Sequence, residues 1–268
     1  MGDRGLKSRA PVIFVGHGSP MNALADNDFT RSLRELRALY PQPRAILVIS
    51  AHWMTEGTWV THMASPKTIH DFYGFPAALF DVRYPAPGSP AVADLVRETV
   101  KSSRIQPDDE MWGLDHGTWS VLRHIFPAAD VPVLQLSLNI AQPASYHLEL
   151  GRQLRGLRDQ GVLILASGNI VHNLRKIRWE QDAAPFDWAL EFDAWARDKL
   201  LARDETALSK EYLAFESGRL SVPTPDHYLP LLYALGASDS RDVLRFTFEG
   251  IQNASISMRT LVFNTPAG

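Results

Sequence analysis

The chain contains no cysteine among its 268 residues. Disulfide bonds, zinc sites built from thiolates and cysteine nucleophiles are therefore excluded. Any metal ion must be held by nitrogen and oxygen atoms, which makes histidine and the carboxylates the principal ligand types. The nine histidines are therefore the first residues to examine in a search for a metal site.

Long apolar segments and an excess of one charge are also lacking. No stretch approaches the length of a membrane span, and the apolar run at residues 11–15 is too short for the core of a signal peptide. The formal net charge of -3 carries no nucleic-acid signature. We therefore expect a soluble cytoplasmic protein that binds neither nucleic acid nor membranes, and the sequence carries no signal for its oligomeric state.

Short β-rich runs alternate with helical patterns along the chain. Continuous apolar strands that alternate with helices indicate an α/β fold whose sheet is covered on both faces. We predict one domain over residues 1–268, because strands continue on both sides of every candidate linker. The predicted strands are 12–15, 46–50, 58–63, 132–137, 162–166, 243–248 and 256–263, with the last expected at a sheet edge, and the predicted helices are 28–40, 91–102, 144–159 and 187–202.

Four histidines lie in segments typical of a functional site: GHGSP around His17, SAHW around His52, GNIVHN around His172 and TPDHYLP around His227. His17 and His52 follow apolar strand-like runs, and His172 follows a third through a short turn. Ligands of open α/β sheets bind in the crevice beyond the carboxyl ends of the strands. We therefore expect these imidazoles to converge on one transition metal.

Each histidine also has an ordinary explanation. A lone histidine is more often a surface residue or a hydrogen-bonded core residue, and GHGSP could form a plain turn. Gly16 and Gly18 begin like a dinucleotide-binding fingerprint, but Met21 replaces the third glycine and weakens that interpretation. Because the two glycines have no side chain, we expect another group to approach the backbone closely there.

The segment around His227 resembles the start of a helix. Thr224 would be the N-cap and Pro225 the first helical residue, with the helix continuing through YLPLLYAL. The positive end of the helix dipole would then keep His227 neutral and ready to coordinate, while Asp226 would interact favourably with the dipole. The alternative is that His227 merely takes the place of glutamate in a capping box.

The remaining histidines have weaker signals. His116, in GLDHGTW, lies at an apparent helix start and could be an acid–base group, a hydrogen-bond donor or a cap. His70 lies in TIHDFYGFP, an aromatic loop typical of a substrate lid, although core packing explains those aromatic residues almost equally well. We expect His62, His124 and His147 to be structural or exposed.

Seven motifs follow one another along the chain: GHGSPMNAL, SAHW, TIHDFYGFP, YPAPGSP, GLDHGTWSVL, ASGNIVHNLR and TPDHYLPLLYALG. Together they resemble the DOPA-dioxygenase group of the LigB-like, class III extradiol ring-cleavage dioxygenases, from about Pro11 to the final strand. The resemblance implies a three-layer α/β/α fold with a mixed central sheet and a mononuclear non-haem Fe(II) site, in which Zn(II) is an alternative occupant. It also implies a DOPA-like catechol and O2 as substrates, and a muconate semialdehyde as product.

The resemblance also assigns roles to individual residues. His17, His52 and His227 match the metal ligands, and His172 matches an active-site base that can also approach the metal. We expect His116 to be a second acid–base group. The residues expected to contact the substrate are Ser19, His70 and Tyr73.

One departure from the family pattern leaves the native metal open. Better-known members complete the site with two histidines and a carboxylate, whereas here His227 stands in the third position with Asp226 beside it. An all-imidazole set suits zinc as well as iron. Two other classes therefore remain: a zinc-dependent hydrolase, and a binding protein like the Memo proteins, which resemble LigB-like dioxygenases but are regarded mainly as signalling adaptors.

Overall fold

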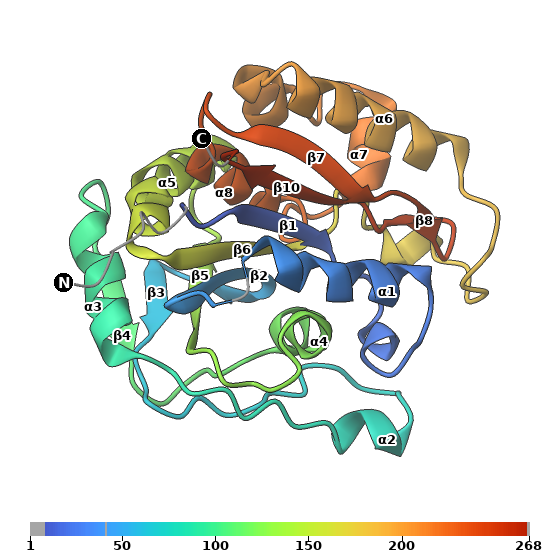
Figure 1. Ribbon diagram of the computed structural model, residues 1–268. Coiled ribbons are helices and arrows are strands. Elements are labelled where there is room, and N and C mark those ends of the chain that lie inside the picture. The colour runs from blue at the N-terminus through green and yellow to red at the C-terminus, as the bar shows by residue number, and fades with distance from the viewer. Residues whose placement is uncertain (1–8, 41, 267–268) are drawn as a thin grey trace.

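The computed structural model describes residues 9–40 and 42–266, which build an eight-stranded sheet with two strands in a separate hairpin (Figure 1). The strands of the sheet are β1 (Val12–Gly16), β2 (Ala45–Thr55), β3 (Thr58–Thr61), β4 (Ile105–Asp108), β5 (Val133–Asn139), β6 (Val162–Gly168), β7 (Val243–Phe248) and β10 (Thr260–Asn264). Their order across the sheet is β4-β3-β5-β2-β6-β1-β10-β7. The four central strands β5, β2, β6 and β1 are parallel, while β3 and β10 run antiparallel to their neighbours β5 and β1. The expected mixed sheet is confirmed.

Helices cover both faces of this sheet. The longer ones are α1 (Asp28–Glu35), α3 (Pro90–Thr99), α4 (His116–Ile125), α5 (Ala144–Leu154), α6 (Asp187–Leu201) and α8 (Leu229–Ala237). The shorter segments are α2 (Ala77–Phe80), α7 (Glu216–Ser221), η1 (Pro20–Ala23), η2 (Leu36–Leu39), η3 (Arg155–Gln160), η4 (Leu174–Lys176) and η5 (Ala207–Glu211).

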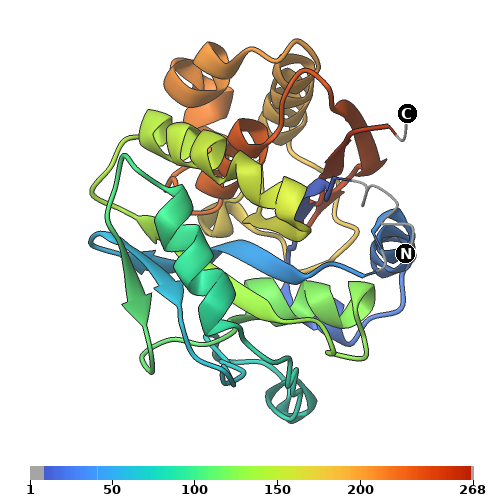
Figure 2. The same cartoon turned by 60° about the vertical axis from the view of Figure 1, so that its left-hand side comes forward.

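Alternate residues of each central strand face different helices, because successive side chains of a strand point to opposite sides. Val12 and Phe14 pack in a core with α3, α5, α6 and α8. Ile13 and Val15 pack in a second core with α1 and α4. Figures 1 and 2 show α5 on one side of the strands and α4 on the other. The expected three-layer α/β/α architecture is therefore confirmed.

The predicted final strand at residues 256–263 is wrong in two respects. It is two strands, of which β9 (Ile256–Ser257) pairs with β8 (Ile251–Gln252) in the hairpin. The other, β10, lies between β1 and β7 rather than at the edge, which β7 forms. The apolar run TLVF is equally compatible with an edge or an interior strand, because composition does not fix the number of pairing partners.

The predicted helix start at Thr224 is also wrong. Helix α8 begins at Leu229, after a turn in which the amides of Tyr228 and Leu229 donate to the carbonyl of Pro225. Pro230 has no N–H group, so it cannot donate to the carbonyl four residues earlier and continue a helix from Thr224. His227 consequently lies in the turn before α8, and the helix-dipole argument for its neutrality does not apply.

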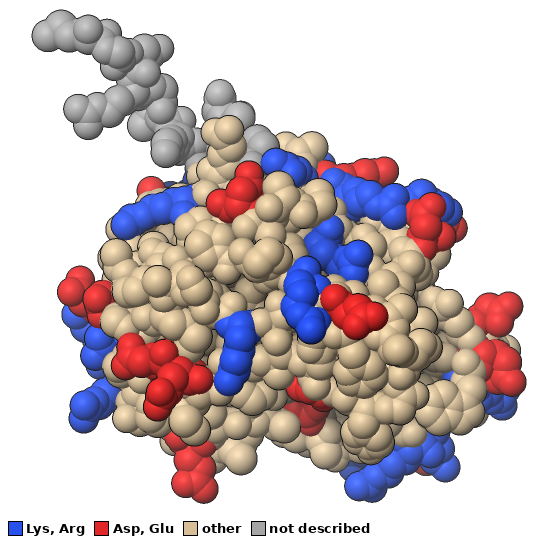
Figure 3. All heavy atoms as spheres, turned by 90° about the horizontal axis from the view of Figure 1, so that it is seen from below, with Lys and Arg blue, Asp and Glu red and all other residues tan. Residues whose placement is uncertain are grey.

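Charges of both signs are interspersed on the face of the molecule seen in Figure 3. Within the described part of the chain, no helix combines the length and the apolar composition needed to cross a membrane.

Candidate metal centre

His17 follows β1 at the carboxyl end of the parallel strands. Gly16 is paired with Gly168 at the end of β6, and the amide of His17 donates to the carbonyl of Gly168 at 3.1 Å. A Cβ atom on Gly16 would lie 2.6 Å from the carbonyl oxygen of Ser257. The close backbone approach expected at this glycine is therefore confirmed, and it fixes the strand end that carries His17.

His52 lies inside β2, which continues to Thr55 and does not end at Ser50 as predicted. The pairing of β2 with β5 changes register between Ile49 and Met54. Such an irregularity bends a strand and redirects its side chains. It lies at the point where His52 faces His17, with the two Nε2 atoms 3.1 Å apart.

The hydrogen bonds of His17 leave its Nε2 atom free to coordinate. Its Nδ1 atom lies 3.0 Å from the Oγ of Ser167, and that hydroxyl donates to the carbonyl of Gly117 at 2.6 Å. The hydroxyl therefore accepts from His17, which places the ring proton on Nδ1 and the lone pair on Nε2. Two imidazole nitrogens 3.1 Å apart can both lie about 2.0–2.1 Å from one metal ion. The two residues fit a metal site.

His227 completes a triangle of imidazoles. Its ring centroid is 5.3 Å from that of His17 and 5.0 Å from that of His52, while the first two are 5.0 Å apart. Its Nδ1 donates a hydrogen bond to Oδ2 of Asp226 at 2.5 Å, which leaves the lone pair of Nε2 available to bind a metal ion. Asp226 therefore orients His227, whereas the sequence predicted Asp226 only as a residue that interacts with a helix dipole. A Cβ atom on Gly168 would lie only 2.2 Å from the carbonyl oxygen of His227. The backbone of His227 can therefore lie this close to the end of β6 because residue 168 is a glycine.

His116 begins α4, as predicted, and it too lies beside the first two histidines. Ligand atoms of His17, His52 and His116 all lie within 4.8 Å of one another, so this group could hold a metal ion. The ring of His116 is nearer to His52 than to His17, with centroid distances of 3.9 and 5.6 Å. Its Nδ1 and backbone N–H both donate to Asp71, at 2.9 and 2.8 Å.

Asp71 is a residue of the site that sequence reasoning missed. Besides its two bonds to His116, its Oδ2 atom is 3.5 Å from Nδ1 of His52. The carboxylate thus orients two histidines of the site from a loop that comes between them in sequence. The signal was available, since metal-binding and catalytic histidines commonly donate their second N–H to a carboxylate. Asp71 directly follows His70 in a motif already singled out.

His172 stacks on His227. Their ring centroids are 3.5 Å apart and their planes are nearly parallel, at 5°. His172 is four residues beyond the end of β6, so it is not held at a strand end as expected. Its backbone N–H donates to the carbonyl of Ser221, and it forms an isolated bridge with Ile256.

Burial keeps three of these imidazoles neutral. It lowers the pKa of His17, His52 and His172 well below the usual value of 6.5, and the neighbouring imidazoles lower each pKa further. Burial alone would raise the pKa of Asp226, but its hydrogen bond with His227 reverses that effect and lowers the pKa. The site therefore combines neutral imidazoles, the form that coordinates a metal, with an ionised carboxylate that orients one of them.

A cavity of about 770 Å³ opens above the histidines. All five, namely His17, His52, His116, His172 and His227, contribute to its lining. Ser19 and Tyr73, two of the three residues expected to contact the substrate, line it as well. Phe72, Phe75 and Trp179 supply aromatic wall. The cavity is large enough for an aromatic molecule, and several imidazole nitrogens of the protein lie at one end of it.

His70, the third expected substrate contact, is not among the residues that line this cavity. Its Nε2 lies 3.0 Å from the carbonyl of Val82, to which it donates. Its ring packs against Phe72, Phe80 and Trp119. The structure therefore makes His70 a support for the loop that carries Asp71 and Phe72.

Comparison with known proteins extends the sequence resemblance. A family model for the catalytic LigB subunit of aromatic ring-opening dioxygenase matches residues 11–260. The 4,5-DOPA dioxygenase extradiol of Escherichia coli (strain K12) is 49% identical over 253 residues, covering 94% of this chain and 93% of that protein. The protein of the same name from Beta vulgaris is 38% identical, covering 85% of this chain and 86% of its own length.

The fold agrees with a solved structure as well. The crystal structure of an uncharacterised protein from Escherichia coli K12 matches with a TM-score of 0.83 and 44% sequence identity, covering 95% of this chain and 99% of that one. The chain therefore belongs to the LigB family of aromatic ring-opening dioxygenases, in its group of extradiol DOPA dioxygenases, and is an oxidoreductase.

Proposed function

We propose that the protein opens the ring of a catechol beside its two hydroxyls, inserting both atoms of O2 to give a muconate semialdehyde. The observation that supports this most is the triangle of His17, His52 and His227, with ring centroids 5.0 to 5.3 Å apart, at the end of a largely apolar cavity. Three ligands on one side of a metal leave positions open for substrates, as in non-haem iron oxygenases.

Fe(II) is the metal that we propose for the reaction, because a redox-active ion allows triplet dioxygen to react with a singlet catechol. We assign His17, His52 and His227 as its ligands. The nearly equal spacing of these three rings favours His227 over His116, whose ring is 3.9 Å from that of His52 and 5.6 Å from that of His17. Zn(II) would fit the same nitrogens.

We propose His172 as the base that takes a proton from a catechol hydroxyl. Its ring lines the cavity and stacks on His227, and its lowered pKa keeps it unprotonated at neutral pH. We propose His116 as the second acid–base group, since its Nδ1 is fixed on Asp71 and its Nε2 remains for the substrate. The aromatic residues Phe72 and Phe75 would pack against the ring and exclude water from the reacting atoms.

The test is reconstitution of the metal-free protein under nitrogen with either Fe(II) or Zn(II), followed by a catechol and then oxygen. We expect the Fe(II) protein to consume one O2 for each catechol and to form a yellow ring-opened product, while the Zn(II) protein consumes none. Ester or amide hydrolysis by the Zn(II) protein, without oxygen uptake by the Fe(II) protein, would support the hydrolase alternative. A protein inactive in both forms would support a binding role.

A further inference from the structure

A second carboxylate, that of Asp115, lies at the start of α4 and is not among the residues that line the reaction cavity. Its side chain is fully buried. The Oδ1 atom accepts hydrogen bonds from the hydroxyl of Ser50 at 2.8 Å and from the amide of Thr118 at 3.1 Å. The Oδ2 atom accepts from the side chains of Gln135 at 2.6 Å and Trp112 at 3.4 Å. Donors therefore surround both oxygens.

These donors compensate for the burial of a carboxylate, which otherwise costs free energy. Burial and the charge of Asp71 raise the pKa of Asp115, while the hydrogen bonds from Gln135 and Ser50 lower it. The contact with Gln135 is reciprocal, because Oε1 of Gln135 accepts from the amide of Asp115 at 2.8 Å. A carboxamide that both donates and accepts in this way has one orientation. The pair fastens the start of α4 to β5.

Through Ser50 the carboxylate is connected to the strand that carries His52. Ser50 is fully buried in the part of β2 where the pairing with β5 changes register. Its Oγ donates to Asp115 and accepts from the amide of His52 at 3.3 Å. A Cβ atom on Gly117 would lie 2.6 Å from that Oγ and 3.0 Å from Cδ2 of His52. The first turn of α4 therefore packs directly against His52, at a distance that glycine permits.

The same turn is also connected to His17. The carbonyl of Gly117 accepts from the hydroxyl of Ser167 at 2.6 Å, and that Oγ lies 3.0 Å from Nδ1 of His17. His116 is itself the first residue of α4 and directly follows Asp115. The spacing of three histidines of the site therefore depends on one turn of one helix.

We propose that Asp115 is a positioning residue of the metal centre, which fixes the first turn of α4 and thereby the distances among His17, His52 and His116. The inference rests on the proposed metal centre and its ring-cleavage function. Residues that orient metal ligands contribute about 10- to 100-fold to metal affinity or activity, and a misplacement of about 1 Å can cost about 100-fold in rate.

The main variant is Asp115→Asn, studied as the Co(II) and Fe(II) proteins. Asparagine is about as good an N-cap as aspartate, so its oxygen can keep the bonds to Ser50 and Thr118. Its amide nitrogen would then face the donors of Gln135 and Trp112, and the glutamine can turn only by losing its bond to the amide of residue 115. We expect the visible spectrum of bound Co(II) to shift, and kcat of the Fe(II) enzyme to fall by about 10- to 100-fold.

A second substitution distinguishes positioning from a general loss of structure. Asp115→Asn combined with Gln135→Glu exchanges donor and acceptor, because a carboxylate at position 135 can accept from both the backbone and the side-chain amide of residue 115. We expect the double variant to recover at least about 10-fold of the lost kcat and to return the Co(II) spectrum toward that of the wild type. A double variant no better than Asp115→Asn would count against the inference.

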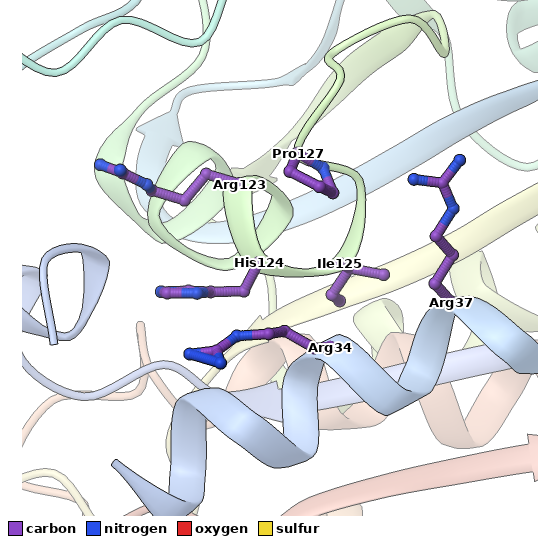
Figure 4. Close-up of a pocket in the computed structure, with 6 residues that line it drawn as sticks. All are labelled: Arg34, Arg37, Arg123, His124, Ile125 and Pro127. Carbon is purple, nitrogen blue, oxygen red and sulfur yellow. The ribbon is translucent and has the colours of Figure 1, made fainter. Parts of the chain in front are cut away.

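Two control variants match the change. Ser89→Ala removes the N-cap of α3, which has ten residues like α4. Arg123→Gln alters the last turn of α4, at a separate cavity of about 270 Å³ that Arg34 and Arg37 also line (Figure 4). We expect both to keep the wild-type Co(II) spectrum and turnover. A comparable spectral shift in either control, or a wild-type spectrum and kcat in Asp115→Asn, would overturn the inference.

The Co(II) spectrum is measured without substrate, so it tests the position of the ligands separately from ring cleavage. An unshifted spectrum in Asp115→Asn overturns the inference alone, whereas an Fe(II) wild type that opens no catechol overturns the proposed function alone. A wild type that binds no Co(II) removes the metal centre and the inference with it. If circular dichroism shows that Asp115→Asn does not fold, Ser50→Ala replaces it, with the same expected shift and the same contrary result.

Discussion

The imidazole rings of His17, His52 and His227 lie with their centroids 5.0 to 5.3 Å apart near the carboxyl ends of the central strands. If they bind one ion in common, His17→Ala and His227→Ala should each remove most of the bound metal without unfolding the chain. His116→Ala should retain it, because we place His116 beside the ligands rather than among them. Metal content by mass spectrometry, with circular dichroism as the check on folding, measures this. A full complement of metal in both of the first two variants would exclude the assignment.

His172 has two competing roles that predict different outcomes. As a base it should leave metal binding nearly intact when replaced, while turnover of His172→Gln falls by roughly 100- to 10,000-fold. As a fourth ligand it should weaken metal affinity as well. We expect the first outcome, because His172 lies face to face with His227 and not in the triangle of rings. Normal turnover in His172→Gln would remove the base role and leave His116 as the candidate.

Histidines at the ends of apolar runs could be found from the sequence, and the structure brings five of the six singled-out histidines, all but His70, to the same cavity. Which hydrogen-bond partner belongs to which histidine could not be found in the same way. Ser167 contacts His17 although 150 positions separate them in the sequence, and Asp71 contacts His116 although 45 positions separate them. Local sequence carries no record of such pairings, because they depend on how the elements pack.

At the scale of elements, helices α5 and α8 meet around a buried histidine outside the metal centre. His147 of α5 is fully buried, and its Nδ1 lies 3.1 Å from the hydroxyl of Tyr233 on α8. Burial lowers the pKa of His147 to about 4. Between pH 6.5 and 4 the unfolded chain therefore binds a proton at this residue that the folded chain excludes, so the free energy of unfolding must decrease as the pH falls through that range.

This linkage can be measured with His147→Gln. A difference of about 2.5 in pKa corresponds to about 3 kcal/mol, at about 1.36 kcal/mol per unit. We expect urea unfolding of the wild type to lose about that much more stability than the variant between pH 7 and pH 4, whatever their difference at pH 7. If the free energies of unfolding of the two proteins change in parallel over this pH range, folding does not lower the pKa of His147.

Helices and strands could be predicted from the sequence where a hydrophobic pattern is compatible with only one kind of element. The strand predicted at residues 243–248 is β7, and the buried run at 162–166 is most of β6. Two of the failures have a common cause in strand pairing. The irregularity that carries β2 past His52 and the interior place of β10 both depend on partners beyond the local window. The helix start was wrong for a local reason, the missing N–H of Pro230.

At the scale of the whole molecule, the cavity beside the histidines is lined mainly by uncharged residues, while charges of both signs are interspersed on the face seen in Figure 3. In the loop at 174–181, Leu174, Ile177 and Trp179 line the cavity, while Arg175, Lys176 and Arg178 are exposed to solvent. Such a cavity suits an apolar aromatic ring. The imidazoles at one end, with any metal that they bind, would then fix the orientation of the substrate.

The most direct test of ring cleavage by dioxygen is the origin of the oxygen atoms in the product. The Fe(II) enzyme is given a catechol under ¹⁸O2, and the aldehyde is reduced before it exchanges its oxygen with water. We predict a ring-opened product with two ¹⁸O atoms, one in the new carboxylate and one in the alcohol made from the aldehyde, and no such product from His17→Ala. A product whose added oxygen comes from water, or a catechol recovered unopened while oxygen is consumed, would contradict the proposed reaction.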